Sequence, residues 1–158
     1  MKVRENKNRF RAQSYNEMNL RLPSLSVNEG MARSAVAAFC AQQNPSATEL
    51  ADIKCAVSEA VTNCIVHAYK ERIDTVYITV AIFDNRVVKI TVRDKGCGID
   101  DVKKAMEPLY TTAGGERAGL GFAVMQSFMD NIRVSSKVGK GTCVTMQKKI
   151  SRRFGFNG

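Results

Sequence analysis

The chain contains the stretch Glu59-Ala60-Val61-Thr62-Asn63 inside a long helical pattern, and three glycine-containing stretches follow it at wide spacing. In order, these are Asp94-Lys95-Gly96-Cys97-Gly98, Gly119-Leu120-Gly121 and Gly139-Lys140-Gly141-Thr142. Each stretch is ordinary by itself. Together they supply an acid and an amide on one helix face, a carboxylate at a strand end and a glycine-rich phosphate loop. This set indicates a site for a magnesium–nucleotide complex.

Glu59 and Asn63 are four residues apart, so they project from the same side of a helix, with Thr62 beside them. Mg²⁺ favours oxygen ligands and retains waters, so the Asn63 amide oxygen and phosphate oxygens suffice as ligands. Glu59 is placed to accept a proton from a hydroxyl or a water aligned on a γ-phosphate. The alternative explanation of this pair is a solvated helix face.

Asp94 follows a run of alternating β-branched residues, where its carboxylate can accept a hydrogen bond from the exocyclic amine of adenine. Gly96 and Gly98 allow close backbone approach, and Ile99 can pack near the base. An ordinary Asp-x-Gly turn is the alternative. The Thr142 hydroxyl can reach adenine through water, although a β-branched strand residue explains it equally well.

Gly119-Leu120-Gly121 precedes a helical pattern, where free backbone N–H groups form an anion site and Arg117 can add a phosphate contact. A plain glycine-rich loop start is the alternative. The stretch lacks the Gly-Lys-Ser/Thr of a Walker loop, and Val124 excludes the dinucleotide pattern. His67, the only histidine, can line the cleft or pack at a helix end, and the structural role is favoured.

The composition predicts one globular domain, because 44% of the 158 residues are hydrophobic and 25% are charged. No apolar run approaches the roughly 20 residues that span a bilayer, and no apolar core follows the basic N-terminus, so we expect a cytoplasmic protein without membrane contact. The five cysteines include no C-x-x-C pair, which argues against zinc or a disulfide framework. Cys40, Cys55 and Cys64 are predicted to be core residues, and Cys97 lies in a loop.

Most of the formal net charge of +9 lies at the two ends, in residues 1–11 and 148–153. We therefore expect a flexible basic extension over 1–15, a folded domain over 16–150 and a basic tail over 151–158. Solvated ends are favoured over tails that touch an acidic partner. Aromatic residues interleaved with basic ones are absent, so no direct nucleic-acid binding is expected.

Periodicity predicts a strand at 18–22, helices at 26–43 and 46–72, strands at 75–83 and 86–93, a helix at 119–130 and strands at 131–137 and 141–149. Residues 94–118 read as a lid with one helical turn at 101–106. Ser26 with Glu29 and Ser46 with Glu49 match capping boxes. This order predicts an α+β fold with one mixed or antiparallel sheet and helices on one face. The apolar face of the first helix is expected to comprise Met31, Ala35, Ala38 and Phe39.

The motif set resembles the GHKL (Bergerat) ATP-binding fold of gyrase and histidine kinases, a two-layer α/β sandwich with a mostly antiparallel sheet and an ATP lid. Residues 59–63 look like its N box, and 94–98 and 119–121 look like its two glycine boxes. Within it, the chain is similar to the family of sporulation anti-sigma F factors over about residues 16–150. The stretches that carry this likeness are Ser58–Asn63, Pro108–Thr112, Glu116–Phe122 and Phe128–Asp130.

The resemblance implies a homodimer that binds ATP or ADP with Mg²⁺, holds a sporulation sigma factor (sigma F) and phosphorylates an anti-anti-sigma protein on serine. Glu59 would be the base, Asn63 the Mg²⁺ ligand and Asp94 the adenine contact, while Arg33 matches a partner-contact position. The lid threonines Thr111 and Thr112 would approach the phosphates with Arg117, and Gly96, Gly98, Gly119 and Gly121 would shape the pocket. The lid departs from the family, since Ala-Gly-Gly between Thr112 and Glu116 is shorter and richer in glycine than the usual form.

Three rival functions stay open at this point. A histidine-kinase catalytic domain would share the fold, but its phosphoacceptor helix has no counterpart, because His67 falls in the N box region. A non-catalytic protein that senses ATP and holds a transcription factor would share the pocket. A nucleic-acid binder would act through the basic tails.

Overall fold

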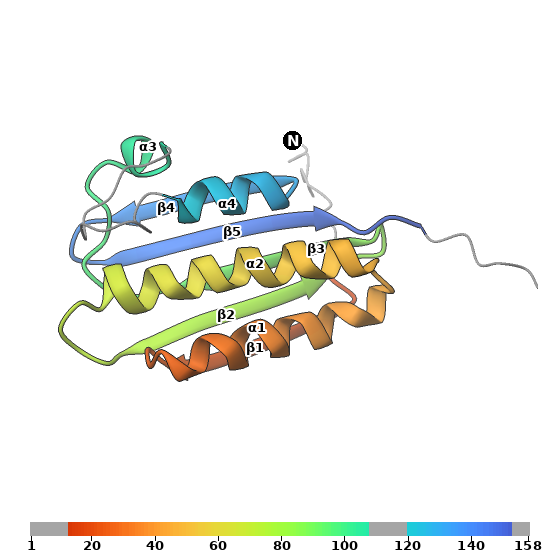
Figure 1. Ribbon diagram of the computed structural model, residues 1–158, viewed down its shortest axis with the longest axis horizontal. Helices are drawn as coiled ribbons and strands as arrows, with labels where there is room; N and C mark the ends of the chain where they lie inside the picture. Colours follow the sequence, from red (N-terminus) through yellow and green to blue (C-terminus); the bar gives the residue numbers. More distant parts are fainter. Residues whose placement is uncertain (1–12, 108–119, 153–158) are drawn as a thin grey trace, which may run out of the picture.

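A computed structural model describes residues 13–107 and 120–152 (Figure 1). The strands are β1 (Asn16–Pro23), β2 (Thr75–Ile82), β3 (Val87–Arg93), β4 (Asn131–Lys137) and β5 (Gly141–Lys149). The helices are α1 (Val27–Cys40), the 3₁₀ turn η1 (Ala41–Gln43), α2 (Ala47–Asn63), the π-helical turn η2 (Cys64–Ala68), α3 (Val102–Ala105) and α4 (Gly121–Phe128).

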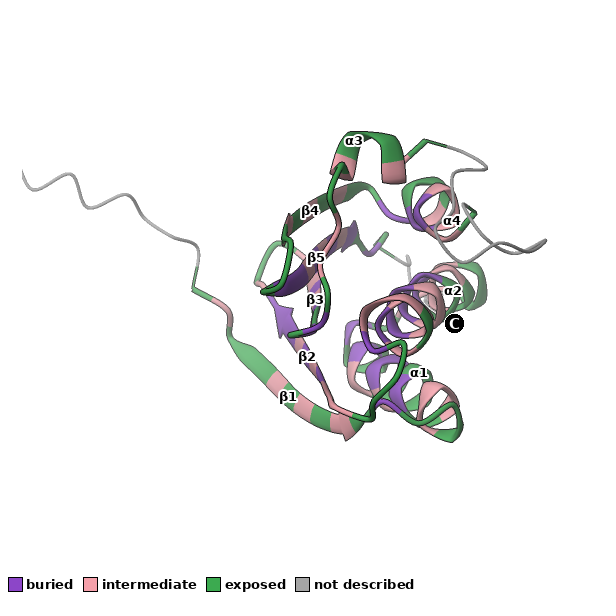
Figure 2. Ribbon diagram, turned by 90° about the vertical axis from the view of Figure 1, so that its left-hand side faces the viewer, coloured by how far each residue is buried: buried purple, intermediate pink, exposed green. Residues whose placement is uncertain are grey.

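The strands form one five-stranded sheet in the order β1-β2-β3-β5-β4, and every pairing among these described strands is antiparallel. β2–β3 and β4–β5 are hairpins, and the edge strand β1 matches the predicted strand at 18–22. Figure 2 shows α1, α2 and α4 together on one side of the sheet. The predicted α+β sandwich with helices on one face is confirmed.

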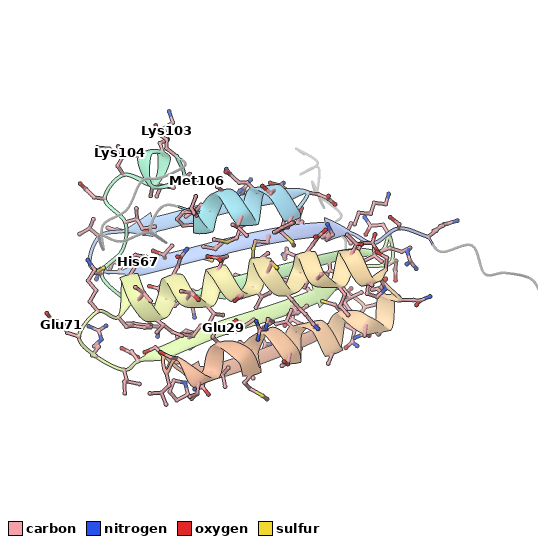
Figure 3. All side chains as sticks on the ribbon, in the orientation of Figure 1. Glu29, His67, Glu71, Lys103, Lys104 and Met106 are labelled. Atoms are coloured by element: carbon pink, nitrogen blue, oxygen red, sulfur yellow. The ribbon has the colours of Figure 1, made fainter. Side chains whose placement is uncertain are left out.

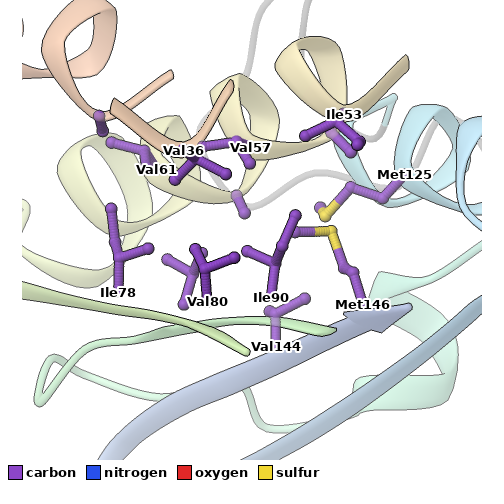
Figure 4. Close-up of a cluster of buried hydrophobic side chains, with 14 of the residues drawn as sticks. Val36, Ile53, Val57, Val61, Ile78, Val80, Ile90, Met125, Val144 and Met146 are labelled. Carbon is purple, nitrogen blue, oxygen red and sulfur yellow. The ribbon is translucent and has the colours of Figure 1, made fainter. Parts of the chain in front are cut away.

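The core fills the layer between the sheet and the helices (Figure 4). Ile78, Val80 and Ile90 point inward from the central strands and face Ile53 and Val57 of α2. Each such side chain contributes about 1.5–3 kcal/mol by leaving water. This layer fixes α2 against β3, and so it holds the polar end of α2 beside the end of β3.

The predicted face of α1 is correct only at its edge, where Phe39 is partly buried and packs against the core. The fully buried side chains of α1 are Ala32, Val36, Ala37 and Cys40, whereas Met31 is 55% exposed. Alanines lie on several sides of α1, and each has little apolar area, so they do not mark one face clearly. The larger side chains Met31 and Phe39 therefore decided the predicted face, and the buried Val36 was missed.

The two predicted capping boxes have opposite outcomes. Ser46 and Glu49 form both reciprocal hydrogen bonds at the start of α2, as predicted. Ser26 has helical backbone angles and makes no side-chain cap, so the box with Glu29 is wrong. Glu29 turns its carboxylate toward α2 instead, where it accepts a hydrogen bond from Ser58.

The helix predicted over residues 46–72 is α-helical only as far as Asn63, where α2 ends. The chain continues as the π-turn η2, which the backbone N–H of Tyr69 closes by donating to the Cys64 carbonyl. Cys97 donates its backbone N–H to the Ala68 carbonyl, so the loop after β3 holds the end of this turn. The predicted helical turn at 101–106 is present as α3, and α4 begins at Gly121.

Two further burial predictions fail. Cys55 is exposed on α2, although Cys40 and Cys64 are buried as expected. Lys148 belongs to β5 and is only 9% exposed, so it is not part of a solvated basic end. No helix in residues 13–107 and 120–152 is long and apolar enough to cross a membrane.

Candidate nucleotide-binding site

Glu59 and Asn63 converge on the first residue of α4. A Cβ placed on Gly121 would lie 3.1 Å from Glu59 Oε2 and 3.3 Å from Asn63 Oδ1. Neither side chain has a hydrogen-bond partner among the residues that the structure describes. The helix spacing that predicted a shared face therefore gives two free oxygens side by side at the N-terminus of another helix.

A cavity of about 440 Å³ opens beside this pair. α2 and η2 form one wall, the ends of β3 and β5 form the floor, and α3 and α4 form the far wall. Its volume is within the range of small-molecule sites. Lining residues that the chemistry can use are Asn63, His67, Asp94, Ile99, Gly121 and Thr142.

Asp94 is the buried acid of the cavity floor, at 5% exposure. Its Oδ1 accepts backbone hydrogen bonds from Gly96 at 2.9 Å and Thr142 at 3.2 Å, and the Cys64 thiol lies 3.6 Å from Oδ2. Burial raises the pKa of Asp94 above its usual 3.8, and these hydrogen bonds lower it in part. Since Oδ2 has only a weak thiol donor among the described residues, it retains capacity to accept a hydrogen bond from a ligand amine.

Glycine is required where the floor of the cavity is closest to neighbouring backbone. Gly98 has a φ of +75°, and a Cβ there would lie 2.3 Å from the Lys137 carbonyl oxygen. Gly141 has a φ of +110°, and its Cβ would lie 2.2 Å from the Asp94 carbonyl oxygen. These contacts bring the loop after β3 and the β4–β5 turn together, so any side chain at either position would open the floor.

His67 lies on η2 and lines the cavity, whereas the sequence favoured a structural role (Figure 3). Its Nδ1 is buried without a hydrogen-bond partner among the described residues. Burial and then the charge of Lys70 lower the pKa of His67 below 6.5, so the imidazole is neutral near pH 7. A neutral ring offers one donor and one acceptor, which suits a polar ligand group.

The other predicted site residues fall into three groups. Ile99 and Thr142 line the cavity, and the Thr142 hydroxyl pairs with Ser136 at 2.8 Å. Thr62, Gly96 and Leu120 are close in sequence to lining residues but do not line the cavity themselves. Thr111, Thr112, Arg117 and Gly119 lie outside the described residues.

Three residues of the site were not predicted from the sequence. Ser136 orders the floor, because its Oγ accepts the backbone N–H of Ile99 at 2.8 Å. Cys64 contacts Asp94 from α2, and Lys104 on α3 adds a cation to the wall. The alternation of β4 marks Ser136 as inward-facing, but no local signal joins it to Ile99, 37 residues away.

The donor set fits a nucleotide with Mg²⁺. An unpaired amide oxygen beside an unpaired carboxylate suits an octahedral ion whose other ligands are phosphates and waters. A buried carboxylate acceptor at the floor suits the exocyclic amine of adenine.

Comparison with protein families matches residues 22–148 to the histidine kinase-like ATPase domain. An anti-sigma F factor of Caldanaerobacter subterraneus subsp. tengcongensis is 56% identical over 138 residues, which cover 87% of this chain and 96% of the relative. An anti-sigma F factor of Priestia megaterium is 48% identical over 138 residues, which cover 86% of this chain and 94% of the relative.

Two solved structures share the fold. The RsbU and RsbW domains of Rv1364c from Mycobacterium tuberculosis match 90% of this chain and 35% of theirs, with a TM-score of 0.65 and 18% identity. The blue-light activated histidine kinase EL346 of Erythrobacter litoralis matches 80% of this chain and 42% of its own, with a TM-score of 0.56 and 20% identity. At these identities the likeness concerns the arrangement of helices and strands.

Proposed function

Because the chain belongs to the histidine kinase-like ATPase family, of GHKL type, we propose that it is an anti-sigma factor that also acts as an ATP-dependent protein serine kinase. The observation that carries this proposal is the convergence of Glu59 and Asn63 at Gly121, next to a cavity with Asp94 in its floor. Phosphoryl transfer from ATP needs a proton acceptor and a metal ligand near the γ-phosphate and a group that holds the adenine. Glu59, Asn63 and Asp94 are suited to these three tasks.

Each residue has a distinct part in the proposed reaction. Asp94 accepts the hydrogen bond of the adenine amine and orients the nucleotide. Asn63 would hold Mg²⁺, which offsets charge on the transferring phosphoryl group when bound. Glu59 accepts the proton of a serine hydroxyl as the serine oxygen bonds to the γ-phosphorus and the bond to the β-phosphate oxygen breaks, releasing ADP.

The relatives named anti-sigma F factor support a sigma factor as the first partner. In our proposal that partner is a sporulation sigma factor, the serine belongs to an anti-anti-sigma protein, and the chain works as a homodimer in the cytoplasm. Arg33 contacts the partner from α1, where its side chain is 44% exposed. We also propose phosphate contacts for Thr111, Thr112 and Arg117, which lie outside the described residues.

The test replaces Glu59 by Ala and measures two quantities, Mg·ATP binding by calorimetry and transfer of labelled phosphate to the anti-anti-sigma protein. Transfer should vanish while binding persists, and Glu71→Ala, an exposed control acid beyond η2, should transfer normally. Labelled serine from Glu59→Ala would remove Glu59 from its role. A wild-type chain that binds Mg·ATP without labelling serine would be a non-catalytic ATP sensor.

A further inference from the structure

The side of the sheet that faces away from the helices carries a concentration of basic side chains. Burial alternates along the strands, and α1, α2 and α4 lie against the other side (Figure 2). On these described strands, Glu17 is the only acid among the outward-facing residues. The outward-facing basic residues are Arg21, Lys89, Arg93, Arg133, Lys137 and Lys149. The strand register therefore gathers positive charge on one face, which the linear sequence does not reveal.

Three basic groups on this face share one aromatic ring. Arg21 and Arg93 are the register partners of Tyr77 on β1 and β3. Their guanidinium carbons lie 5.5 Å and 4.9 Å from the centroid of the Tyr77 ring, and the Lys95 ammonium lies 5.2 Å from it. The ring attracts each cation, but the three like charges repel one another, and no described acid forms an ion pair with any of them. An anion bound here would relieve that repulsion.

A shallow hollow of about 490 Å³ continues this cluster toward the β4–β5 turn. The only acid in its lining, Asp94, is buried, and its carboxylate accepts backbone hydrogen bonds in the floor of the nucleotide cavity. The hollow is therefore lined by an excess of positive charge. Its basic residues are Arg93, Lys95, Lys137 and Lys140, and we call these four residues together with Arg21 the basic track.

The basic track crosses the sheet from one edge to the other. Arg21 lies on the edge strand β1 and Lys137 on the edge strand β4, so five strands spaced about 4.8 Å apart give a length of about 19 Å. This length suits a few units of one extended polymer. The outward-facing residues next to the track in the middle of the sheet carry hydroxyl groups, and they are Thr79, Thr91 and Thr145.

These side chains suit a nucleic acid better than a protein. Protein interfaces depend on aromatic and apolar side chains that enter pockets of the partner, and the Tyr77 ring of this face is already in contact with cations. Nucleic-acid interfaces are more polar and much more positively charged, and Arg, Lys, Ser and Thr supply many of their phosphate contacts. A second copy of the chain would place like charges against each other.

We propose that the basic track binds a single strand of nucleic acid through its phosphates, independently of sequence. The guanidinium planes of Arg21 and Arg93, held over Tyr77, are also suited to stacking with bases. The sequence predicted no nucleic-acid contact, because no local stretch combines basic and aromatic residues, but the strand register brings distant ones together. This binding goes beyond the proposed function and does not depend on it.

The experiment measures binding of a labelled deoxythymidine strand of about 15 nucleotides to the full chain by fluorescence anisotropy, with Mg·ATP present to occupy the nucleotide cavity. For single strands, the logarithm of the affinity falls with the logarithm of the salt concentration, with a slope of about −0.7 per phosphate contact. Arg93→Gln with Lys137→Gln removes two contacts. We expect the Kd at about 50 mM salt to rise about tenfold and the slope to become shallower by about 1.4.

The matched control is Lys54→Gln with Lys103→Gln, which removes the same charge from exposed positions on α2 and α3. It should keep the slope of the wild type and a Kd within about twofold of it. Thermal unfolding shows whether the variants fold. If the variant of the track does not, Lys140→Gln in the exposed β4–β5 turn gives the same comparison, with a change in slope of about 0.7.

Two further probes identify the occupant, namely a polyglutamate peptide of the same length and the corresponding duplex. Weaker binding of both than of the single strand supports the proposal. A peptide or a duplex that binds as tightly as the strand, through the same residues, would overturn it. Equal Kd and slope in the two double variants would place the binding on the basic ends and would also overturn it, as would a wild type that does not bind the strand at about 50 mM salt. Phosphotransfer to serine is measured separately, so a failure here leaves the proposed function standing.

Discussion

The backbone N–H of Thr142 donates a 3.2 Å hydrogen bond to the carboxylate of Asp94, 48 residues away. In return, the backbone N–H of Asp94 donates to the Thr142 carbonyl at 2.9 Å. The pair closes the cavity floor where β3 ends and β5 begins. Asp94 is therefore held by backbone groups on two sides, which fixes its direction before any ligand arrives.

Asp94→Asn tests the proposed contact between Asp94 and adenine. The amide keeps the size of the side chain, but it replaces one acceptor oxygen by a donor that repels the adenine amine. We expect the affinity for Mg·ATP to fall about 10- to 100-fold, because a hydrogen bond to a charged group contributes about 1.5–3 kcal/mol. Calorimetry with Mg·ATP and Mg·GTP measures this, and discrimination between the two should diminish.

The control for that experiment is Asp84→Asn in the exposed β2–β3 turn, which should bind Mg·ATP as the wild type does. Thermal unfolding of both variants shows whether they fold. Unchanged binding in folded Asp94→Asn would show that the carboxylate does not read the base.

Gly121→Ala tests the convergence of Glu59 and Asn63. The added methyl would lie 3.1 Å from the Glu59 carboxylate and 3.3 Å from the Asn63 amide, so both side chains must move by a few tenths of an ångström. We expect serine phosphorylation to fall about tenfold, because small displacements of catalytic groups are costly. The free energy of unfolding should change by no more than about 1 kcal/mol, because the displacement of the two side chains offsets the higher helix propensity of Ala.

Gly30→Ala in α1 is the matched control, since its methyl would have its nearest neighbour at 3.8 Å, an ordinary contact. It should gain stability and keep full phosphotransfer. Equal phosphotransfer in the two variants would mean that Gly121 does not set the positions of Glu59 and Asn63 for the proposed reaction.

The sequence predicted those parts of the site that depend on local spacing. The pairing of Glu59 with Asn63 follows from one helical turn, and the hairpins follow from their turns and alternation. The π-turn at η2 was missed, because the hydrogen bond from Cys97 to Ala68 that holds it joins distant segments. His67 lines the cavity on that turn, so its position was hidden for the same reason.

The wrong predictions of which side chains are buried have a different cause. Cys55 and the alanines of α1 carry too little apolar area to decide which face turns inward, so tertiary packing decides it. The positive charge of Lys148 predicted a solvated residue near the C-terminal end of the chain. Its alkyl stem is instead buried, and its ammonium forms an ion pair with Asp52 on α2. Such pairings depend on which helix covers which strand.

The lowered pKa of Glu49 predicts that the stability of the folded protein depends on pH. Burial favours a higher pKa for this carboxyl, but hydrogen bonds from Ser46 and Ser151 outweigh it and lower the pKa from 4.5 to about 2. A lowered pKa in the folded state stabilises the protein above pH 4.5, and this contribution disappears as the pH falls from 4.5 to about 2. Glu49 is partly exposed, so solvent screening reduces the effect.

Glu49→Gln keeps the shape of the capping box and removes the titration. We expect the wild type to be the more stable protein at about pH 6, and the two to converge at low pH, as measured by urea unfolding. The exposed Glu71→Gln serves as the control variant. A stability difference between wild type and Glu49→Gln that stays constant over this range would contradict the assignment.

Lys148 and Asp52 predict a large cost for breaking one buried pair. Lys148 Nζ lies 3.1 Å from Asp52 Oδ2 and donates to the Phe128 carbonyl at 2.7 Å, which joins β5 to α2 and α4. Asp52→Ala leaves the buried ammonium of Lys148 with one neutral partner, so the free energy of unfolding should fall by about 2–3 kcal/mol. Arg33→Ala breaks an exposed pair instead and should cost at most about 1 kcal/mol.

Replacing both members of the buried pair, in Asp52→Leu with Lys148→Met, should recover much of the loss, because no unpaired charge is left. If urea unfolding gives equal losses for Asp52→Ala and Arg33→Ala, then the pair is screened by water and Lys148 behaves as the solvated basic end that its sequence suggested.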